Sequence, residues 1–161
     1  MNNNENYWKI LSEINDAIKF AETKGIAIIS TSGILTAFLF SKKDLNTEFN
    51  NCSFFVLFIL CIAFLFLSIL FSLLSVKPNF SIKSKYSFFY FNSIVRAHKN
   101  ETDFKENIKK ALSNENEIQS QLTEQIYTKS KIAKRKFKFI NISIYSFIIF
   151  LTLLLVLMII K

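Results

Sequence analysis

The stretch that decides the fold is residues 52–76, which reads CSFFVLFILCIAFLFLSILFSLLSV and contains no charged residue. As an α-helix rising 1.5 Å per residue it would be about 37 Å long, enough to cross a bilayer core of about 30 Å with some tilt. Its apolar side chains would occupy every face of that helix, whereas a surface helix of a soluble protein has one apolar stripe. We therefore predict a transmembrane helix here.

Two more uncharged stretches flank this one in the chain. Residues 139–160, FINISIYSFIIFLTLLLVLMII, are also long enough to span a bilayer. Residues 25–40, GIAIISTSGILTAFLF, would reach about 24 Å and are slightly short. The start of the chain, MNNNENYWK, is polar and mixed in charge, so we expect no cleaved signal peptide. The sequence thus predicts three transmembrane helices.

The scarcity of turn residues sets the fold class. The 161 residues include 2 Gly and 1 Pro but 19 Phe, which favours a few long helices. The same scarcity excludes the glycine-rich loops that hold phosphates or dinucleotides. We predict an all-α integral membrane protein.

Positive charge is concentrated between the second and third predicted spans. Residues 77–138 contain fourteen of the 20 Lys and Arg residues, and residues 1–24 contain another three. With three spans these two segments share one side of the membrane, and the positive-inside rule makes it the cytoplasmic side, with the C-terminus outside. The formal net charge of +8 arises from residues 77–138 and indicates membrane orientation, not nucleic-acid binding.

The cytoplasmic segments are predicted to be helical as well. Residues 7–22 have apolar residues at three- and four-residue steps, which is typical of an amphipathic helix continuous with the first span. Its apolar stripe either packs on another helix or lies flat on lipid. Pro78 should end the second span, and the aromatic run 86–98 suits a short linking helix.

From about Asp103 onward the chain contains no Gly or Pro, so we expect one long helix that continues through the third span. Glu115 and Gln125 would be the polar members of its apolar seam. The expected cytoplasmic layer consists of extensions of the first and third spans plus the linking helix. The predicted boundaries are 1–24, cytoplasmic amphipathic helix; 25–40, transmembrane helix; 41–51, external loop; 52–76, transmembrane helix; 77–138, cytoplasmic helical region; and 139–160, transmembrane helix.

Residues for metal or catalytic chemistry are sparse. His98 is the only histidine, and Cys52 and Cys61 lie about 13 Å apart along one helix, too far to form a disulfide with each other. The sequence contains no Ser/His/Asp set, carboxylate cluster or Cys/His metal-ligand spacing. We therefore expect no enzymatic activity, no metal site and no cofactor.

Two other features have alternative readings. Gly33 and Ala37 form a small-residue face suited to close helix packing, either within the monomer or between monomers. The basic run KSKIAKRKFK (129–138) would anchor anionic lipid, and it would bind a nucleotide phosphate only if other groups converge on it. Lys24 at the end of one span and Lys131 and Arg135 just outside another lie at similar predicted depths, so such convergence is geometrically feasible.

Several segments together resemble a known family. The stretch IKFAETKGIAIISTSG (18–33) resembles the opening signature of the membrane-type Pycsar effector family, with Glu22, Thr23 and Lys24 as its polar residues. Pro78, the run FFYFNSI from Phe88, and LTEQIYTKSKIAKRKFKFI (122–140) match the rest of that pattern in the same order. The resemblance covers nearly the whole chain.

The resemblance implies a bacterial antiphage effector of the inner membrane. Such effectors are partnered with a pyrimidine cyclase that makes a cyclic mononucleotide on infection, and they respond by impairing the membrane. This chain shows no separate β-rich nucleotide-binding domain, so any nucleotide site must be built from the helical cytoplasmic segments. We also expect the chain to form a homo-oligomer in the lipid bilayer. The candidate nucleotide-binding residues are Glu22, Thr23, Lys24, Gln125, Lys131 and Arg135.

A second function remains open from the residues alone. A passive membrane scaffold or toxin-immunity protein would use the cytoplasmic seam of residues 104–126 to bind a protein partner. The segments FAETK and EQIYTKSKIAKRK favour the effector.

Overall fold

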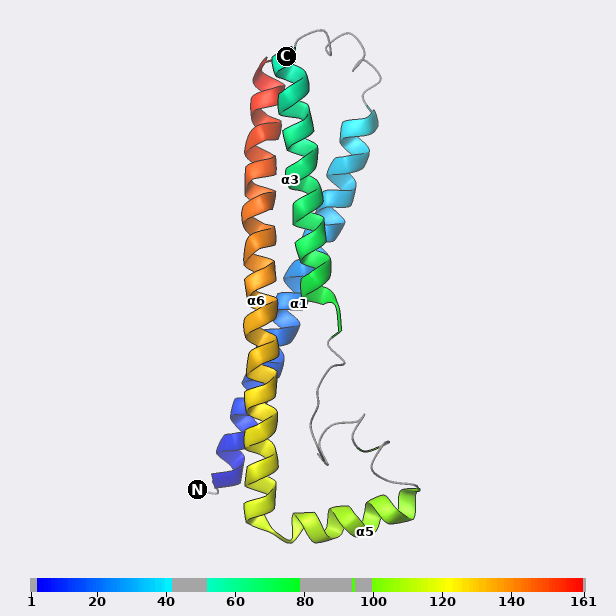
Figure 1. Ribbon diagram of the computed structural model, residues 1–161, viewed down its shortest axis with the longest axis vertical. Helices are drawn as coiled ribbons and strands as arrows, with labels where there is room; N and C mark the ends of the chain where they lie inside the picture. Colours follow the sequence, from blue (N-terminus) through cyan, green and yellow to red (C-terminus); the bar gives the residue numbers. More distant parts are fainter. Residues whose placement is uncertain (1–2, 42–51, 79–93, 95–99, 161) are drawn as a thin grey trace. The chain divides into compact units, whose positions relative to one another are not determined.

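The computed structural model describes residues 3–41, 52–78, 94 and 100–160. Within these residues the chain forms four helices and no strand: α1 (Asn3–Ser41), α3 (Cys52–Val76), α5 (Glu101–Leu112) and α6 (Glu115–Ile160) (Figure 1). The expectation of an all-helical chain is therefore confirmed for the described residues. The predicted linking helix at 86–98, with His98, and the external loop at 41–51 lie largely outside them.

The first two helices match their predicted extents. α1 runs through 39 residues without a break, as the absence of any breaker other than glycine predicted. α3 covers the 25 uncharged residues of the central stretch and ends at Val76, two residues before Pro78. Proline disfavours helical backbone in the residue before it, which explains this end.

The expected single helix from Asp103 onward is wrong, because the chain breaks between α5 and α6. Ser113 caps the end of α5, where its amide donates to the Lys110 carbonyl and its hydroxyl to the Lys109 carbonyl. The Asn114 carbonyl then accepts from the amides of Glu117 and Ile118, which starts α6. Ser and Asn bond readily to nearby backbone, so this Ser-Asn pair favours a break without any Gly or Pro.

The described chain divides into two compact units. The first contains residues 1–18 and 78–133, and the second contains residues 19–77 and 134–161. α1 and α6 therefore each contribute one segment to both units. The two units are described separately below.

In the second unit, α3 runs beside α6, and the α1 segment packs against both (Figure 1). At Gly25 the three helices pack closely against one another. A Cβ atom added there would lie 2.9 Å from the Val76 side chain, 3.4 Å from the Ser72 carbonyl and 3.8 Å from the Ile140 side chain. A glycine is what permits this approach, because any larger residue would push the neighbours apart.

The apolar core of the second unit lies farther along the same helices. Cys61 and Leu65 of α3 are buried against Phe150 and Leu157 of α6. By contrast, Gly33 and Ala37 of the predicted small-residue face do not pack on other described residues. A Cβ atom added at Gly33 would meet nothing within 4 Å, and Ala37 is exposed among the described residues.

The first unit contains the start of α1, all of α5 and the start of α6. Leu11, Ala111 and Leu122 are buried. Gln125 is also buried, as predicted for a polar member of the seam. Glu115 is exposed, so its predicted place on the seam is wrong. It lies in the first turn of α6, where a carboxylate is stabilised by the helix dipole without any partner helix.

Two of the described helices are long and apolar enough to cross a membrane. They are the α3 segment Phe54–Val76 and α6, whose apolar part is its C-terminal half. Residues 25–40 of α1 are not among them, so a third crossing stays a prediction.

Candidate functional site

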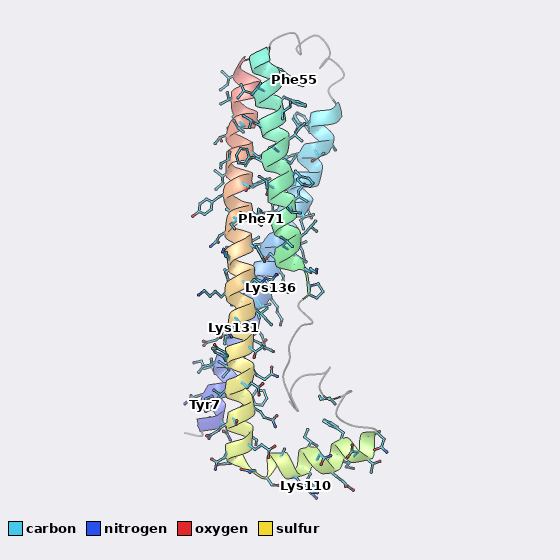
Figure 2. The ribbon with its side chains drawn as sticks, in the orientation of Figure 1. Tyr7, Phe55, Phe71, Lys110, Lys131 and Lys136 are labelled. Atoms are coloured by element: carbon cyan, nitrogen blue, oxygen red, sulfur yellow. The ribbon has the colours of Figure 1, made fainter. Side chains whose placement is uncertain are left out.

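The feature that joins all three helices of the second unit is the side chain of Lys136 on α6 (Figure 2). Its Nζ donates to Glu22 Oε1 on α1 at 2.8 Å and to the Ser75 carbonyl on α3 at 2.6 Å. It also lies 3.3 Å from the carbonyl of Lys77, just beyond the end of α3. An ammonium group has three protons to donate, so these three acceptors satisfy all of them.

Two local effects explain why a lysine is stable in this buried position. The last carbonyls of α3 have no partner within their own helix and carry partial negative charge, which a cation at the helix end neutralises. The Glu22 carboxylate supplies the full counter-charge that a buried ammonium needs. The backbone reinforces the contact, since the Ser75 hydroxyl donates to the Lys136 carbonyl at 3.4 Å.

The burial of this ion pair is unequal. The Lys136 side chain is 6% exposed and the Glu22 side chain is 36% exposed. Glu22 therefore approaches Lys136 from the solvent side, while the carbonyls of α3 enclose it from the other. We call Glu22, Lys136 and the carbonyls of Ser75 and Lys77 the Lys136 cluster.

Beyond the Lys136 cluster, serine hydroxyls connect α3 to α6. The Ser68 hydroxyl donates to the Ser143 carbonyl at 3.1 Å, and the Ser143 hydroxyl donates to the Ser68 carbonyl at 2.8 Å. The hydroxyls of Ser72 and Ser143 lie 2.6 Å apart. All three side chains are fully buried. We call Ser68, Ser72 and Ser143 the serine seam.

The predicted basic residues are arranged differently from Lys136. Each of Lys24, Lys131 and Arg135 is exposed and lies over an aromatic ring four residues away on its own helix. The cation-to-centroid distances are 4.2 Å for Lys24 on Phe20, 4.4 Å for Lys131 on Tyr127 and 5.4 Å for Arg135 on Phe139. A cation over a ring is attracted by the negative face of the π-system, and this holds the charge at the surface.

The six candidate nucleotide-binding residues are divided between the two units. Glu22, Thr23, Lys24 and Arg135 belong to the second unit, and Gln125 and Lys131 belong to the first. Thr23 donates its hydroxyl to the Lys19 carbonyl of its own helix at 3.0 Å. Within the described part of the second unit, no hydrogen bond or ion pair joins Glu22, Thr23, Lys24 and Arg135 to one another. Their role in nucleotide binding stays a prediction.

Sequence reasoning assigned Lys136 only to the basic run, yet a signal for its buried position was present. Inward-facing positions of α6 recur every seven residues. A helix that packs on other helices has an effective period near 3.5 residues, so every seventh residue lies on the same face. Five members of this series are buried and Lys129 is half-buried; the series is Leu122, Lys129, Lys136, Ser143, Phe150 and Leu157. Lys129 and Lys136 are thus the two cations of the run that face inward.

Lys129 has its own partner in the first unit. Its Nζ donates to Asn15 Oδ1 of α1 at 2.7 Å. Burial removes water from the ammonium group and lowers the pKa of Lys129 below its ordinary value of 10.5. A neutral amide oxygen compensates the charge less than a carboxylate would.

The described residues contain no group of three or more His, Cys, Asp or Glu side chains placed to hold a metal ion. Cys61 has a free, buried thiol that lies 3.9 Å from the Phe150 carbonyl. The charged groups described above are the ion pair of Lys136 with the partly exposed Glu22 and several exposed cations.

The long apolar helices and the basic segment before the last apolar stretch are typical of a helical membrane protein. The profile of the Pycsar effector protein domain matches residues 6–161, nearly the whole chain. The chain therefore belongs to the Pycsar effector family, which confirms the resemblance seen in its sequence.

One curated relative supports this membership. The chain is 31% identical over 135 residues to the Pycsar effector protein SaPycTM of Staphylococcus aureus. The aligned region covers 81% of this chain and 78% of the relative. No solved structure matches the chain.

Proposed function

We propose that this protein is an antiphage effector of the bacterial inner membrane. It responds to a cyclic pyrimidine mononucleotide, made by a partner nucleotide cyclase, by assembling with further copies and impairing the membrane, which ends in abortive infection. The observation that carries this proposal is the family match over residues 6–161. The protein acts without catalysis and needs no cofactor beyond the activating nucleotide.

The proposed topology has three crossings, with residues 1–24 and 77–138 in the cytoplasm and the C-terminus outside. The support is the concentration of fourteen Lys and Arg residues in 77–138, together with the two apolar helices. α1 would make the remaining crossing through residues 25–40. Alkaline phosphatase fused after Lys161 should be active, and the same enzyme fused within 100–114 should be inactive. The reverse pattern would contradict this orientation.

Charge supports an anionic ligand on the cytoplasmic side. Lys24 and Arg135 are exposed in the second unit, and neither is held by a carboxylate among the described residues. A cyclic nucleotide carries one phosphodiester charge, which Lys and Arg bind through charge-assisted hydrogen bonds. We propose that these two exposed residues attract the nucleotide and contact its phosphate from the solvent side.

The test is membrane permeability in cells that express the effector with a pyrimidine nucleotide cyclase. Wild-type cells should take up an impermeant dye only when the cyclase is active. Lys24→Ala combined with Arg135→Ala should reduce this uptake while membrane insertion, checked by fractionation, is retained. Unchanged uptake would remove both residues from the site. A membrane that stays sealed while nucleotide accumulates would refute the effector function and favour a scaffold or immunity protein.

A further inference from the structure

The Lys136 cluster has a property that the exposed cations lack, because its positive charge is buried and needs an anion at all times. Its carbonyl partners, Ser75 in the last turn of α3 and Lys77 just beyond that helix, keep their places as long as α3 is intact. Its carboxylate partner sits at the end of a flexible side chain that is 36% exposed. Of the three acceptors, Glu22 is therefore the one that another anion can replace.

We propose that Lys136 is the receptor for the phosphate of a phosphodiester monoanion, and that Glu22 occupies this site in the resting protein as an internal competitor. The proposal rests on the proposed function for its main ligand, a cyclic pyrimidine mononucleotide. The exchange conserves charge, since one carboxylate leaves the ammonium group and one phosphodiester takes its place. The two carbonyls of α3 remain bound to Lys136 throughout.

The exchange has a mechanical consequence within the second unit. Glu22 is the residue through which α1 is tied by charge to α6 and, through the shared ammonium group, to the end of α3. When a ligand takes its place, Glu22 moves into water and this tie is lost. Three residues farther along α1, Gly25 packs against Val76 and Ile140, so the released segment is the one on which the close approach of the three helices depends.

A phosphodiester monoanion has two sources at this position. One is the cyclic nucleotide, and the other is the headgroup of an anionic lipid such as phosphatidylglycerol. The shared chemistry is a single negative charge with two acceptor oxygens. The lipid composition of the test membrane separates the two sources.

The experiment measures binding of cyclic CMP and cyclic UMP to the full-length protein in nanodiscs of phosphatidylcholine alone. Glu22→Gln removes the competing charge and keeps the side-chain size. If Glu22 occupies the site in about nine of ten molecules, its loss should tighten nucleotide binding about tenfold. A misfolded variant would bind less, so a gain in affinity cannot arise from damage to the fold.

Lys136→Met keeps the apolar stem and removes the receptor charge, so it should weaken binding by about tenfold or more. Both variants break the tie to α1, so both should release dye from liposomes without nucleotide. The matched controls are Glu13→Gln on α1 and Lys134→Met on α6, both on exposed side chains. These should leave affinity within about twofold of the wild type and the liposomes sealed.

The outcomes separate this inference from the proposed function. If the wild type binds nucleotide and both Glu22→Gln and Lys136→Met bind it equally well, Lys136 is not the receptor, while the effector function stands. If the wild type binds neither nucleotide, the proposed ligand is wrong. The same variants are then compared for phosphatidylglycerol retained on purification: more with Glu22→Gln and less with Lys136→Met supports a lipid-occupied site, and equal amounts overturn the inference.

Discussion

Replacing Gly25 by alanine tests the close approach of α1, α3 and α6 directly. The new methyl group would lie 2.9 Å from Cγ2 of Val76, closer than side-chain carbons approach, and 3.4 Å from the Ser72 carbonyl. Val76 is branched at Cβ and has few rotamers to retreat into, so the helices themselves must shift. Gly33→Ala is the matched control in the same helix, because a methyl group there meets nothing within 4 Å.

Two opposing effects determine how each substitution changes the free energy of unfolding. Alanine is better than glycine in a helix interior by about 1 kcal/mol, and both substitutions share this gain. Overpacking a tight contact costs about 1–3 kcal/mol, and only Gly25→Ala incurs this cost. The free energy of unfolding should therefore be about 1–3 kcal/mol lower for Gly25→Ala than for Gly33→Ala, whatever the absolute gain in a membrane-like environment.

The assay is reversible unfolding of the purified protein in mixed micelles. The fraction of dodecyl sulfate is raised while helicity is followed by circular dichroism. The comparison of the two alanine variants is more reliable than either absolute value, because both have the same micelle and the same reference state. Equal stability of Gly25→Ala and Gly33→Ala would refute the three-helix junction.

Two further predictions concern the polar contacts. Ser143→Ala removes both the donor to the Ser68 carbonyl and the partner of the Ser72 hydroxyl, and should lower the free energy of unfolding by about 0.6–1.7 kcal/mol. A double-mutant cycle with Ser72→Ala checks this, and strict additivity would contradict the contact. Lys129→Met tests how the stability of the protein depends on pH. Burial lowers the pKa of Lys129 in the folded protein below the ordinary 10.5, so the unfolded chain binds this proton more tightly. Stability should consequently rise with pH between the lowered value and 10.5, and an undiminished rise in Lys129→Met would assign it to another group.

The helices that were predicted correctly are those whose limits depend on composition alone. The uncharged stretch of α3 predicts that helix and Pro78 predicts its end, because neither signal depends on what the helix packs against. α1 was likewise predictable as one helix from the absence of breakers. The break at Ser113 and Asn114 was not, because serine and asparagine favour a break without requiring one, and Ser12 and Asn15 lie inside the unbroken helix α1.

The candidate site was less predictable, for a related reason. The run 129–138 contains six cations, and charge alone does not say which of them face inward. The orientation of Lys136 follows from the seven-residue repeat of α6 together with acceptors on α1 and α3, and those acceptors are 59 or more residues away in sequence. The same limitation affected the glycines. Gly33 has small neighbours in sequence, yet it is Gly25, among larger ones, that the folded chain places against two other helices.

The serine seam gives the contact between α3 and α6 an unusual reversibility. An apolar seam in lipid gains little from being apolar, and a seam of charged pairs would leave bare charges in hydrocarbon if the helices separated. A serine hydroxyl avoids both extremes because it can donate to a carbonyl one turn back in its own helix. Thr36 already does so in α1, where its hydroxyl donates to the Ser32 carbonyl at 2.7 Å. The hydroxyls of Ser68, Ser72 and Ser143 thus have alternative acceptors within their own helices if α3 and α6 separate.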